Sequence, residues 1–257
     1  MSMGLRAIKK RVLELLAGIG PLPEVEFTGD KPELADGREG EVEARLAGVV
    51  AELAQLPRPQ VLKVLFSLLC HNDPALRWRA VSLMGPLVAD LAEYDMEAAR
   101  VVMRRLMWSL NDESGGIGWG APEAMAECLA HHSGLAEEYT HILVSFMRED
   151  GFFLEYPPLQ RGLMWAMGRL AMVRPHLLEQ KNAQTYLLSY LDSPDPTVRG
   201  LAARSLGILQ VAAARQRLST LQGQRESVVF YCRERLLVGT VGDLAAAALL
   251  RLSSIAP

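Results

Sequence analysis

A repeat of about 40 residues is the feature of this 257-residue sequence that most restricts its fold. The segments "RWRAVSLMG", "GWGAPEAMA", "QRGLMWAMG" and "RGLAARSLG" align on their last residues, Gly85, Ala126, Gly168 and Gly207, which lie 41, 42 and 39 residues apart. Self-similarity at such a period indicates stacked supersecondary units, each of which buries its apolar face on its neighbours. We therefore expect a repeat protein.

Each of these segments has the spacing of a helix with one buried stripe. In each segment one apolar residue stands directly before the anchor, and a second stands five residues before the anchor. Both lie on the same helix face. These pairs are Ala80 and Met84, Ala121 and Met125, Leu163 and Met167, and Ala202 and Leu206. The small anchor residues would allow neighbouring helices to approach closely.

A turn rich in Asp, Asn or Pro precedes each segment, and another amphipathic helix, such as "PQVLKVLFSLL", precedes each turn. The stretches "DPALRWRAVSLMG" and "DPTVRGLAARSLG" resemble the Asp-Pro-x-x-Arg turn-and-helix pattern of the HEAT-like repeat (armadillo-type α-solenoid) family. The resemblance covers residues 58–210, with 38–56 and 227–252 as degenerate terminal repeats. It implies an all-α fold, a right-handed α-solenoid (superhelix) of about five HEAT-like helical-hairpin repeats.

The first 37 residues are expected to form a separate region ahead of the solenoid, which would span 38–257. Leu5, Ile8, Val12 and Leu16 recur at helical spacing, and 20–37 is a Pro/Gly-rich linker. The helix is expected to dock on the body or cap its open end; a membrane-surface or partner-binding helix is the alternative. No apolar run reaches the roughly 20 residues of a membrane span, so no membrane insertion is predicted.

One face of the second helices carries aromatic and charged side chains opposite the buried stripe. Counted from the anchors, this face holds Trp78 and Ser82, then Trp119, Glu123 and Glu127, then Arg161, Trp165 and Arg169, and finally Arg204. In HEAT repeats these helices line the concave side, so the resemblance implies a groove that binds a protein or peptide partner. The alternatives are that Trp78 and Trp165 belong to the core and that the charges form a solvated ladder.

The turn "NDESGGIGWG" before the second segment is two residues longer than its counterparts and contains four glycines. Such a turn, followed by a helix N-terminus, could cradle an anion or a peptide backbone through Gly116 and Gly118. The alternative is that the glycines let Trp119 fold over a neighbouring repeat.

Cysteine usage predicts a cytoplasmic protein, and no cofactor is predicted. Cys70, Cys128 and Cys232 lie far apart within apolar helical patterns, which favours reduced, buried thiols over disulfides. Cys128, His131 and His132 fall within one helical turn, but no second pair of metal ligands follows, so no metal is predicted. No nucleophile motif can be identified, which favours a non-catalytic scaffold or adaptor.

The alternative function is nucleic-acid binding. Trp119, Glu123 and Arg161 resemble the concave tryptophan, acid and arginine of the HEAT-like alkylpurine DNA glycosylases. Glutamate replaces the expected aspartate, and the net charge of −3 contrasts with the basic character of DNA-binding proteins. These departures leave a protein partner as the first choice.

Overall fold

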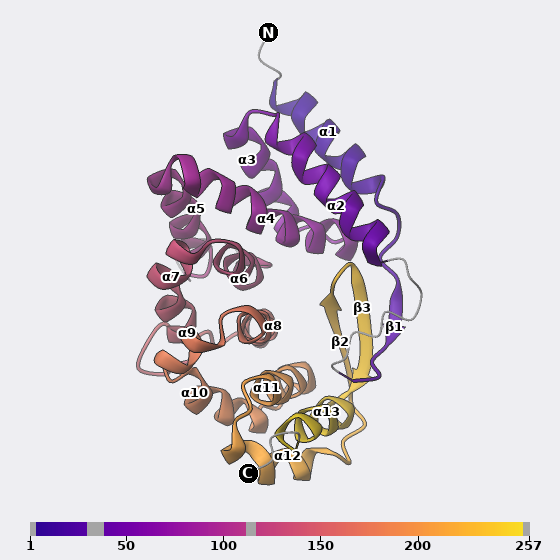
Figure 1. The fold of residues 1–257 in the computed structure, drawn as a ribbon, viewed down its shortest axis with the longest axis vertical. Coiled ribbons are helices and arrows are strands. Elements are labelled where there is room, and N and C mark those ends of the chain that lie inside the picture. The colour runs from indigo at the N-terminus through magenta and orange to yellow at the C-terminus, as the bar shows by residue number, and fades with distance from the viewer. Residues whose placement is uncertain (1–3, 30–38, 112–116, 254–257) are drawn as a thin grey trace. The chain divides into compact units, whose positions relative to one another are not determined.

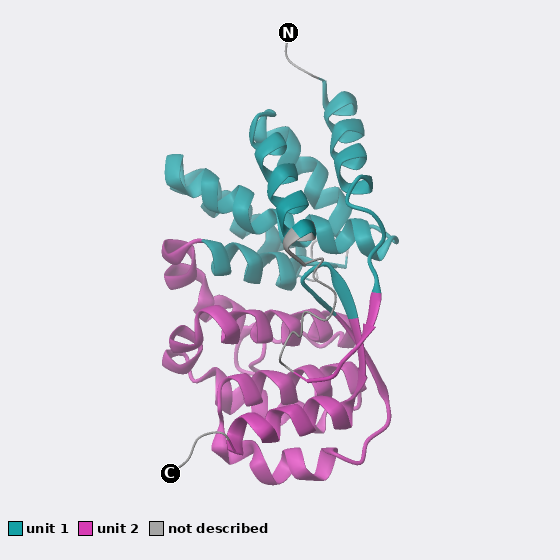
Figure 2. Cartoon of the chain, turned by 45° about the vertical axis from the view of Figure 1, so that its right-hand side comes forward, with its two compact units in different colours: residues 1–23, 33–131, 231–236 teal, residues 24–32, 132–230, 237–257 magenta. Residues whose placement is uncertain are grey.

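The computed structural model describes residues 4–29, 39–111 and 117–253 (Figure 1). Helical hairpins make up most of these residues, so the chain has an α-solenoid fold of the HEAT/armadillo-like type. It forms two compact units, which Figure 2 colours separately. Unit 1 comprises 1–23, 33–131 and 231–236, and unit 2 comprises 24–32, 132–230 and 237–257.

Unit 1 is built on six helices within its described residues. They are α1 (Leu5–Ala17), α2 (Glu39–Ala54), α3 (Arg58–Leu69), α4 (Pro74–Tyr94), α5 (Met96–Ser109) and α6 (Ala121–His131). Helix α4 packs on α3, α5 and α6. Helix α1 packs on α3 with Ile8, Val12 and Leu16 fully buried, so the prediction that it docks on the body is confirmed. The predicted domain boundary at residue 37 stays a prediction.

Unit 2 continues the helical hairpins. Its helices are α7 (Ser133–Ser145), α8 (Pro157–Val173), α9 (Pro175–Gln180), α10 (Ala183–Ser189), α11 (Pro196–Ile208), α12 (Arg215–Leu221) and α13 (Val241–Ser253). Helix α11 packs on α8 and on α13, and α12 packs on α13. None of the helices in the described ranges combines the length and apolar character needed to cross a bilayer.

The repeat anchors mark close helix contacts, as the period predicts. A Cβ atom on Gly207 would lie 2.5 Å from Cα of Ala248, and one on Gly85 would lie 2.9 Å from the carbonyl oxygen of Glu127. The Asp-Pro turns cap their helices: Asp73 accepts a hydrogen bond from the N–H of Ala75 at 2.8 Å, and Asp195 accepts one from that of Thr197 at 2.9 Å. Glycine and aspartate therefore serve the fold at these positions.

Residues 227–252 were predicted to be a degenerate helical repeat, and this prediction is wrong in its first half. The segment forms strands β2 (Ser227–Cys232) and β3 (Arg235–Thr240) before α13 begins. The expected linker contributes a third strand, β1 (Glu24–Glu26), and the strand order is β1-β3-β2. The sequence "SVVFY" is rich in β-branched and aromatic residues, which prefer strands, and this local preference prevails over the repeat.

Candidate functional site

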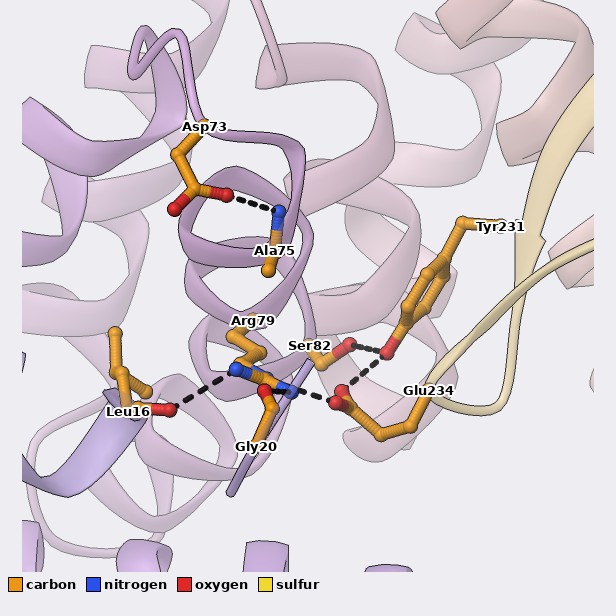
Figure 3. A network of polar contacts seen from close by, with 8 residues as sticks. All are labelled: Leu16, Gly20, Asp73, Ala75, Arg79, Ser82, Tyr231 and Glu234. Atoms are coloured by element: carbon orange, nitrogen blue, oxygen red, sulfur yellow. Dashed lines mark hydrogen bonds and ion pairs between the residues drawn. The ribbon is translucent and has the colours of Figure 1, made fainter. Parts of the chain in front are cut away.

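The tip of the β2–β3 hairpin packs on helix α4 within unit 1 (Figure 3). The rings of Trp78 and Tyr231 stack with centroids 4.7 Å apart and planes 7° from parallel. The hydroxyl of Tyr231 donates to Oε1 of Glu234 at 2.6 Å and lies 2.8 Å from Oγ of Ser82. Because the phenol has a single proton, the Ser82 hydroxyl donates to the Tyr231 oxygen. The predicted residues Trp78 and Ser82 therefore contact a segment about 150 residues later in the chain.

Arg79 completes this contact from the same helix. Its Nε donates to Oε2 of Glu234 at 2.9 Å, and its two terminal nitrogens donate to the carbonyl oxygens of Leu16 at 3.0 Å and Gly20 at 2.7 Å. The side chains of Arg79 and Glu234 are only 3% and 5% exposed. A buried ion pair is tolerated when hydrogen bonds satisfy it in this way, and its geometry then specifies one arrangement.

The electrostatics of the hairpin tip keep the phenol of Tyr231 protonated. Burial and the neighbouring Glu234 carboxylate raise the pKa of Tyr231 well above its usual value of 10. The phenol therefore keeps its proton at neutral pH and acts as a hydrogen-bond donor. The two turn residues, Arg233 and Glu234, have φ of 48° and 59°. This left-handed conformation is costly for side-chain-bearing residues, and the contacts of Glu234 with α4 hold it in place.

The base of the same hairpin packs on α11 within unit 2. Val228 is fully buried, and a Cβ atom on Gly200 would lie 2.9 Å from its Cγ2. The guanidinium of Arg204 lies 5.2 Å from the ring centroid of Phe230, and the rings of Phe230 and Phe27 form an edge-to-face pair with centroids 5.7 Å apart. In each unit, taken by itself, the chain's own hairpin covers part of the face on which the sequence placed a binding groove.

The other predicted binding residues divide by burial. Glu127, Trp165 and Arg204 are 6%, 8% and 8% exposed. Arg161 is half-exposed, and its Nε and one terminal nitrogen bind Oδ2 of the α11 cap residue Asp195 at 2.8 and 2.7 Å. Trp119 is half-buried in the turn before α6, and Arg169 is half-buried on α8.

Close packing explains the described glycines of the Gly-rich turn. A Cβ atom on Gly118 would lie 2.4 Å from the carbonyl oxygen of Ser109. Gly120 has φ of +72° and rests against Leu69. These two glycines are needed for the turn to pack. Gly116, also predicted to bind, lies outside the described residues.

Glu123 carries the most perturbed carboxyl group among the predicted binding residues. Its Oε2 is buried and has no hydrogen-bond partner within the described part of the chain. Burial raises its pKa to about 7, against the opposing influence of its own backbone N–H and of Arg77. A buried oxygen without a donor is costly and can accept a hydrogen bond from a ligand.

The residues considered for metal binding have local structural contacts. The thiol of Cys128 is buried, which raises its pKa, and Nδ1 of His132 accepts a hydrogen bond from the N–H of Leu135 at 3.1 Å. Nδ1 of His131 lies 2.9 Å from the carbonyl oxygen of Glu127. Over the described ranges, His, Cys, Asp and Glu side chains form no cluster of three suited to a metal. The prediction that all cysteines are buried holds for Cys128 only: Cys70 is exposed at the end of α3, and Cys232 is half-buried.

Sequence reasoning missed a pocket in unit 2. It has a volume of about 490 Å³ and is lined by Glu24, Val25, Glu26, Ser227, Val238, Gly239, Thr240 and Asp243. Asp243 accepts from the N–H of Thr240 at 2.8 Å, while Oγ1 of Thr240 accepts from the N–H of Asp243 at 3.1 Å. This reciprocal pair of hydrogen bonds caps α13, so Asp243, one of the three acidic residues that line the pocket, has a structural role.

Comparison with known proteins shows distant likeness only. No family model matches the chain. Over 83 residues it is 34% identical to an uncharacterized protein of Archaeoglobus fulgidus, and the match spans 32% of this chain and 42% of that protein. The chain thus spans less than half the length of that relative.

Similar solved structures are of the helical-repeat kind. A designed armadillo repeat protein in complex with the peptide (KR)4 has a TM-score of 0.47 and 16% identity, covering 95% of this chain and 99% of its own. Kap121p bound to Nup53p has a TM-score of 0.45 and 14% identity, covering 84% of this chain and 22% of its own. An engineered protein reaches a TM-score of 0.49 at 17% identity, with 96% and 99% covered.

Proposed function

We propose that this chain is a non-catalytic scaffold or adaptor that binds a protein or peptide partner on the hairpin-facing side of its repeat helices. One observation carries the proposal: helix α4 already holds a polypeptide segment, residues 231–234, through an aromatic stack and a buried ion pair. Aromatic residues and arginine are enriched at the centres of protein interfaces. The same face therefore has the chemistry that recognises polypeptide.

In each unit, taken by itself, the residues proposed to meet a partner are those of its hairpin-facing helices and turns that keep exposed surface. In unit 1, Trp119 would act as the apolar anchor, and the half-buried Glu123 would pair with a basic partner group. Arg161 and Arg169 would bind acidic partner groups, with Arg161 oriented by Asp195. Trp78, Glu127, Trp165 and Arg204 would support these positions from within the fold, and Gly118 would shape the turn.

The proposal is tested by affinity capture from the native lysate after nuclease treatment. Trp119→Ala combined with Arg161→Glu is expected to lose the captured partner while helicity and melting temperature stay close to wild type. A matched control, Tyr94→Ala with Lys10→Glu, changes an exposed aromatic and an exposed cation elsewhere and should retain capture. Equal capture by both variants would place the partner surface elsewhere.

A nucleic-acid-binding protein or DNA glycosylase of the HEAT-like alkylpurine type is the second candidate. The observation that favours it is the Glu123 carboxyl, whose pKa of about 7 suits proton transfer at neutral pH. Duplex DNA affinity that falls steeply between 50 and 200 mM salt, and release of alkylated bases abolished by Glu123→Gln, are what this function requires. Salt-independent or undetectable DNA binding would leave the protein partner.

A further inference from the structure

The exposed side of helix α5 carries a second apolar stripe that the fold does not use. Its buried side consists of Ala99, Val102, Met103 and Leu106, which complete the packing of the helix in unit 1. On the opposite side Val101 and Trp108 are 53% and 55% exposed. Seven residues separate them, so they lie on one face, two turns apart. Isolated exposed apolar residues are ordinary, but an exposed tryptophan aligned with a second apolar residue is a recognisable interaction feature.

Basic side chains surround this stripe. Arg104 and Arg105 lie between Val101 and Trp108, and the guanidinium of Arg105 lies 3.9 Å from the ring centroid of Phe66 on α3. Lys63 stands exposed one helical turn before Phe66. We call Lys63, Phe66, Val101, Arg104, Arg105 and Trp108 the α5 patch.

Acidic groups are concentrated at the N-terminal end of α5. Asp95 caps the helix, accepting from the N–H of Ala98 at 3.0 Å. Glu97 binds Arg104 at 2.6 Å and Arg100 at 3.6 Å, and the hydrogen bond from Arg104 lowers the pKa of Glu97. Among the described residues of α5 and its cap, Arg100, Arg104 and Arg105 stand against the two carboxylates of Asp95 and Glu97, and Lys63 on α3 adds a fourth cation. The patch is locally positive in a chain whose net charge is −3.

We infer that the α5 patch docks an acidic amphipathic helix of a protein partner. Apolar side chains two turns apart on such a helix would match Val101 and Trp108, and its flanking carboxylates would pair with Arg104, Arg105 and Lys63. Arginine forms directed, charge-assisted bonds with carboxylates and its stem packs on apolar surface. A partner helix can cover Val101 and Trp108 with apolar side chains, whereas a nucleic-acid backbone presents only phosphate and sugar to them. This surface is distinct from the hairpin-facing side used in the proposed function.

The test uses the full chain and a fluorescent synthetic peptide about 18 residues long, with leucine at helical spacing and glutamate elsewhere. Saturable binding by fluorescence anisotropy is expected, weakened about tenfold or more by Trp108→Ala and by Arg104→Glu with Arg105→Glu. Phe152→Ala, which removes a 66%-exposed aromatic elsewhere, is the matched control and should bind as wild type. Thermal melting confirms that each variant is folded.

Four results would overturn the inference. Absence of binding, equal binding of a lysine-for-glutamate peptide, or unchanged affinity in the two patch variants would each do so. Tighter binding of a duplex DNA fragment than of the acidic peptide would replace the protein partner by nucleic acid. Because Trp119→Ala with Arg161→Glu leaves the α5 patch intact, that variant should bind the peptide normally, which separates this inference from the proposed function.

Discussion

Arg79 joins three segments of unit 1 that are distant in sequence: the end of α1, the residues that follow it, and the hairpin tip. Replacing it with methionine removes the partner of a buried carboxylate. We expect Arg79→Met to lower the free energy of unfolding by about 3–5 kcal/mol, the usual cost of breaking one side of a buried ion pair. Urea denaturation monitored by circular dichroism measures this loss.

The double variant Arg79→Met with Glu234→Met is the control for that prediction. With both charges removed, no buried charge is left without a partner, so the double variant should be more stable than Arg79→Met alone. Additive losses from the two single substitutions would show that the ion pair contributes little beyond its separate contacts.

Glu123 should make stability depend on pH near neutrality. Its carboxyl has a pKa of about 7 in the folded chain against an ordinary value of 4.5, so between these values the folded state holds a proton that the unfolded state has lost. Stability therefore falls as pH rises from about 4.5 to 7 and levels off above 7. The difference corresponds to at most about 3 kcal/mol.

Glu123→Gln should remove this pH dependence. The free energy of unfolding of the variant should therefore increase relative to that of wild type between pH 5 and pH 8. Urea unfolding at both pH values measures this increase. Glu43→Gln, on the exposed surface of α2, serves as the control and should change stability equally at the two pH values. A Glu123→Gln profile parallel to wild type would mean that the carboxyl is solvated in solution.

At the scale of the helices, glycine has opposite roles at Gly207 and Gly48. A Cβ atom on Gly207 would overlap Ala248 on α13, whereas nothing lies within 4 Å of one on Gly48 in α2. We expect Gly207→Ala to lower the melting temperature, with a cost of about 1–3 kcal/mol, and Gly48→Ala to raise stability by about 0.5–1 kcal/mol. Calorimetry of both variants checks the opposite signs. A loss in both would indicate that α2 relies on its glycine for another reason.

The hairpin turn offers a second test at this scale. A two-residue turn with positive φ at both positions is the pattern that favours Asn-Gly, yet Arg233 and Glu234 occupy it. We expect Arg233→Asn to stabilise the chain by about 0.5–1 kcal/mol and Arg233→Val to destabilise it, because β-branched residues resist the left-handed conformation. Thermal melting distinguishes the two, and a change of the same sign in both would contradict the turn geometry.

The helices were predictable because their apolar residues recur at a helical period and their caps are local. The hairpin was not, although "SVVFYC" has strand composition, because its turn "RE" lacks the glycine or asparagine that announces a hairpin. The repeat of about 40 residues also correctly assigned Trp78 and Arg204 to the second helices of their repeats, α4 and α11. Their partners Tyr231 and Phe230 could not be named, since no sequence pattern links residues so far apart in the chain.

At the scale of the whole molecule, the hairpin contributes residues to both units. Tyr231→Ala removes the stack with Trp78 and should raise amide hydrogen exchange in α1 and α4 of unit 1. Val228→Ala opens a cavity beside Gly200 and should raise exchange in α11 and α13 of unit 2. Mass-spectrometric exchange of both variants tests this. Identical, uniform increases across the chain would show one cooperative unit.

Unit 1 combines segments that are far apart in the chain, and this has a consequence for biosynthesis. A ribosome completes residues 1–131 well before residues 231–236, which unit 1 requires. At about 5–20 residues per second, this delay lasts roughly 5–20 seconds. During it, Trp78 and Arg79 have no hairpin tip to contact and present an aromatic and a charged surface to solvent. A newly made chain therefore passes through a stage at which chaperones, or another strand of suitable composition, can occupy the face that the hairpin later covers.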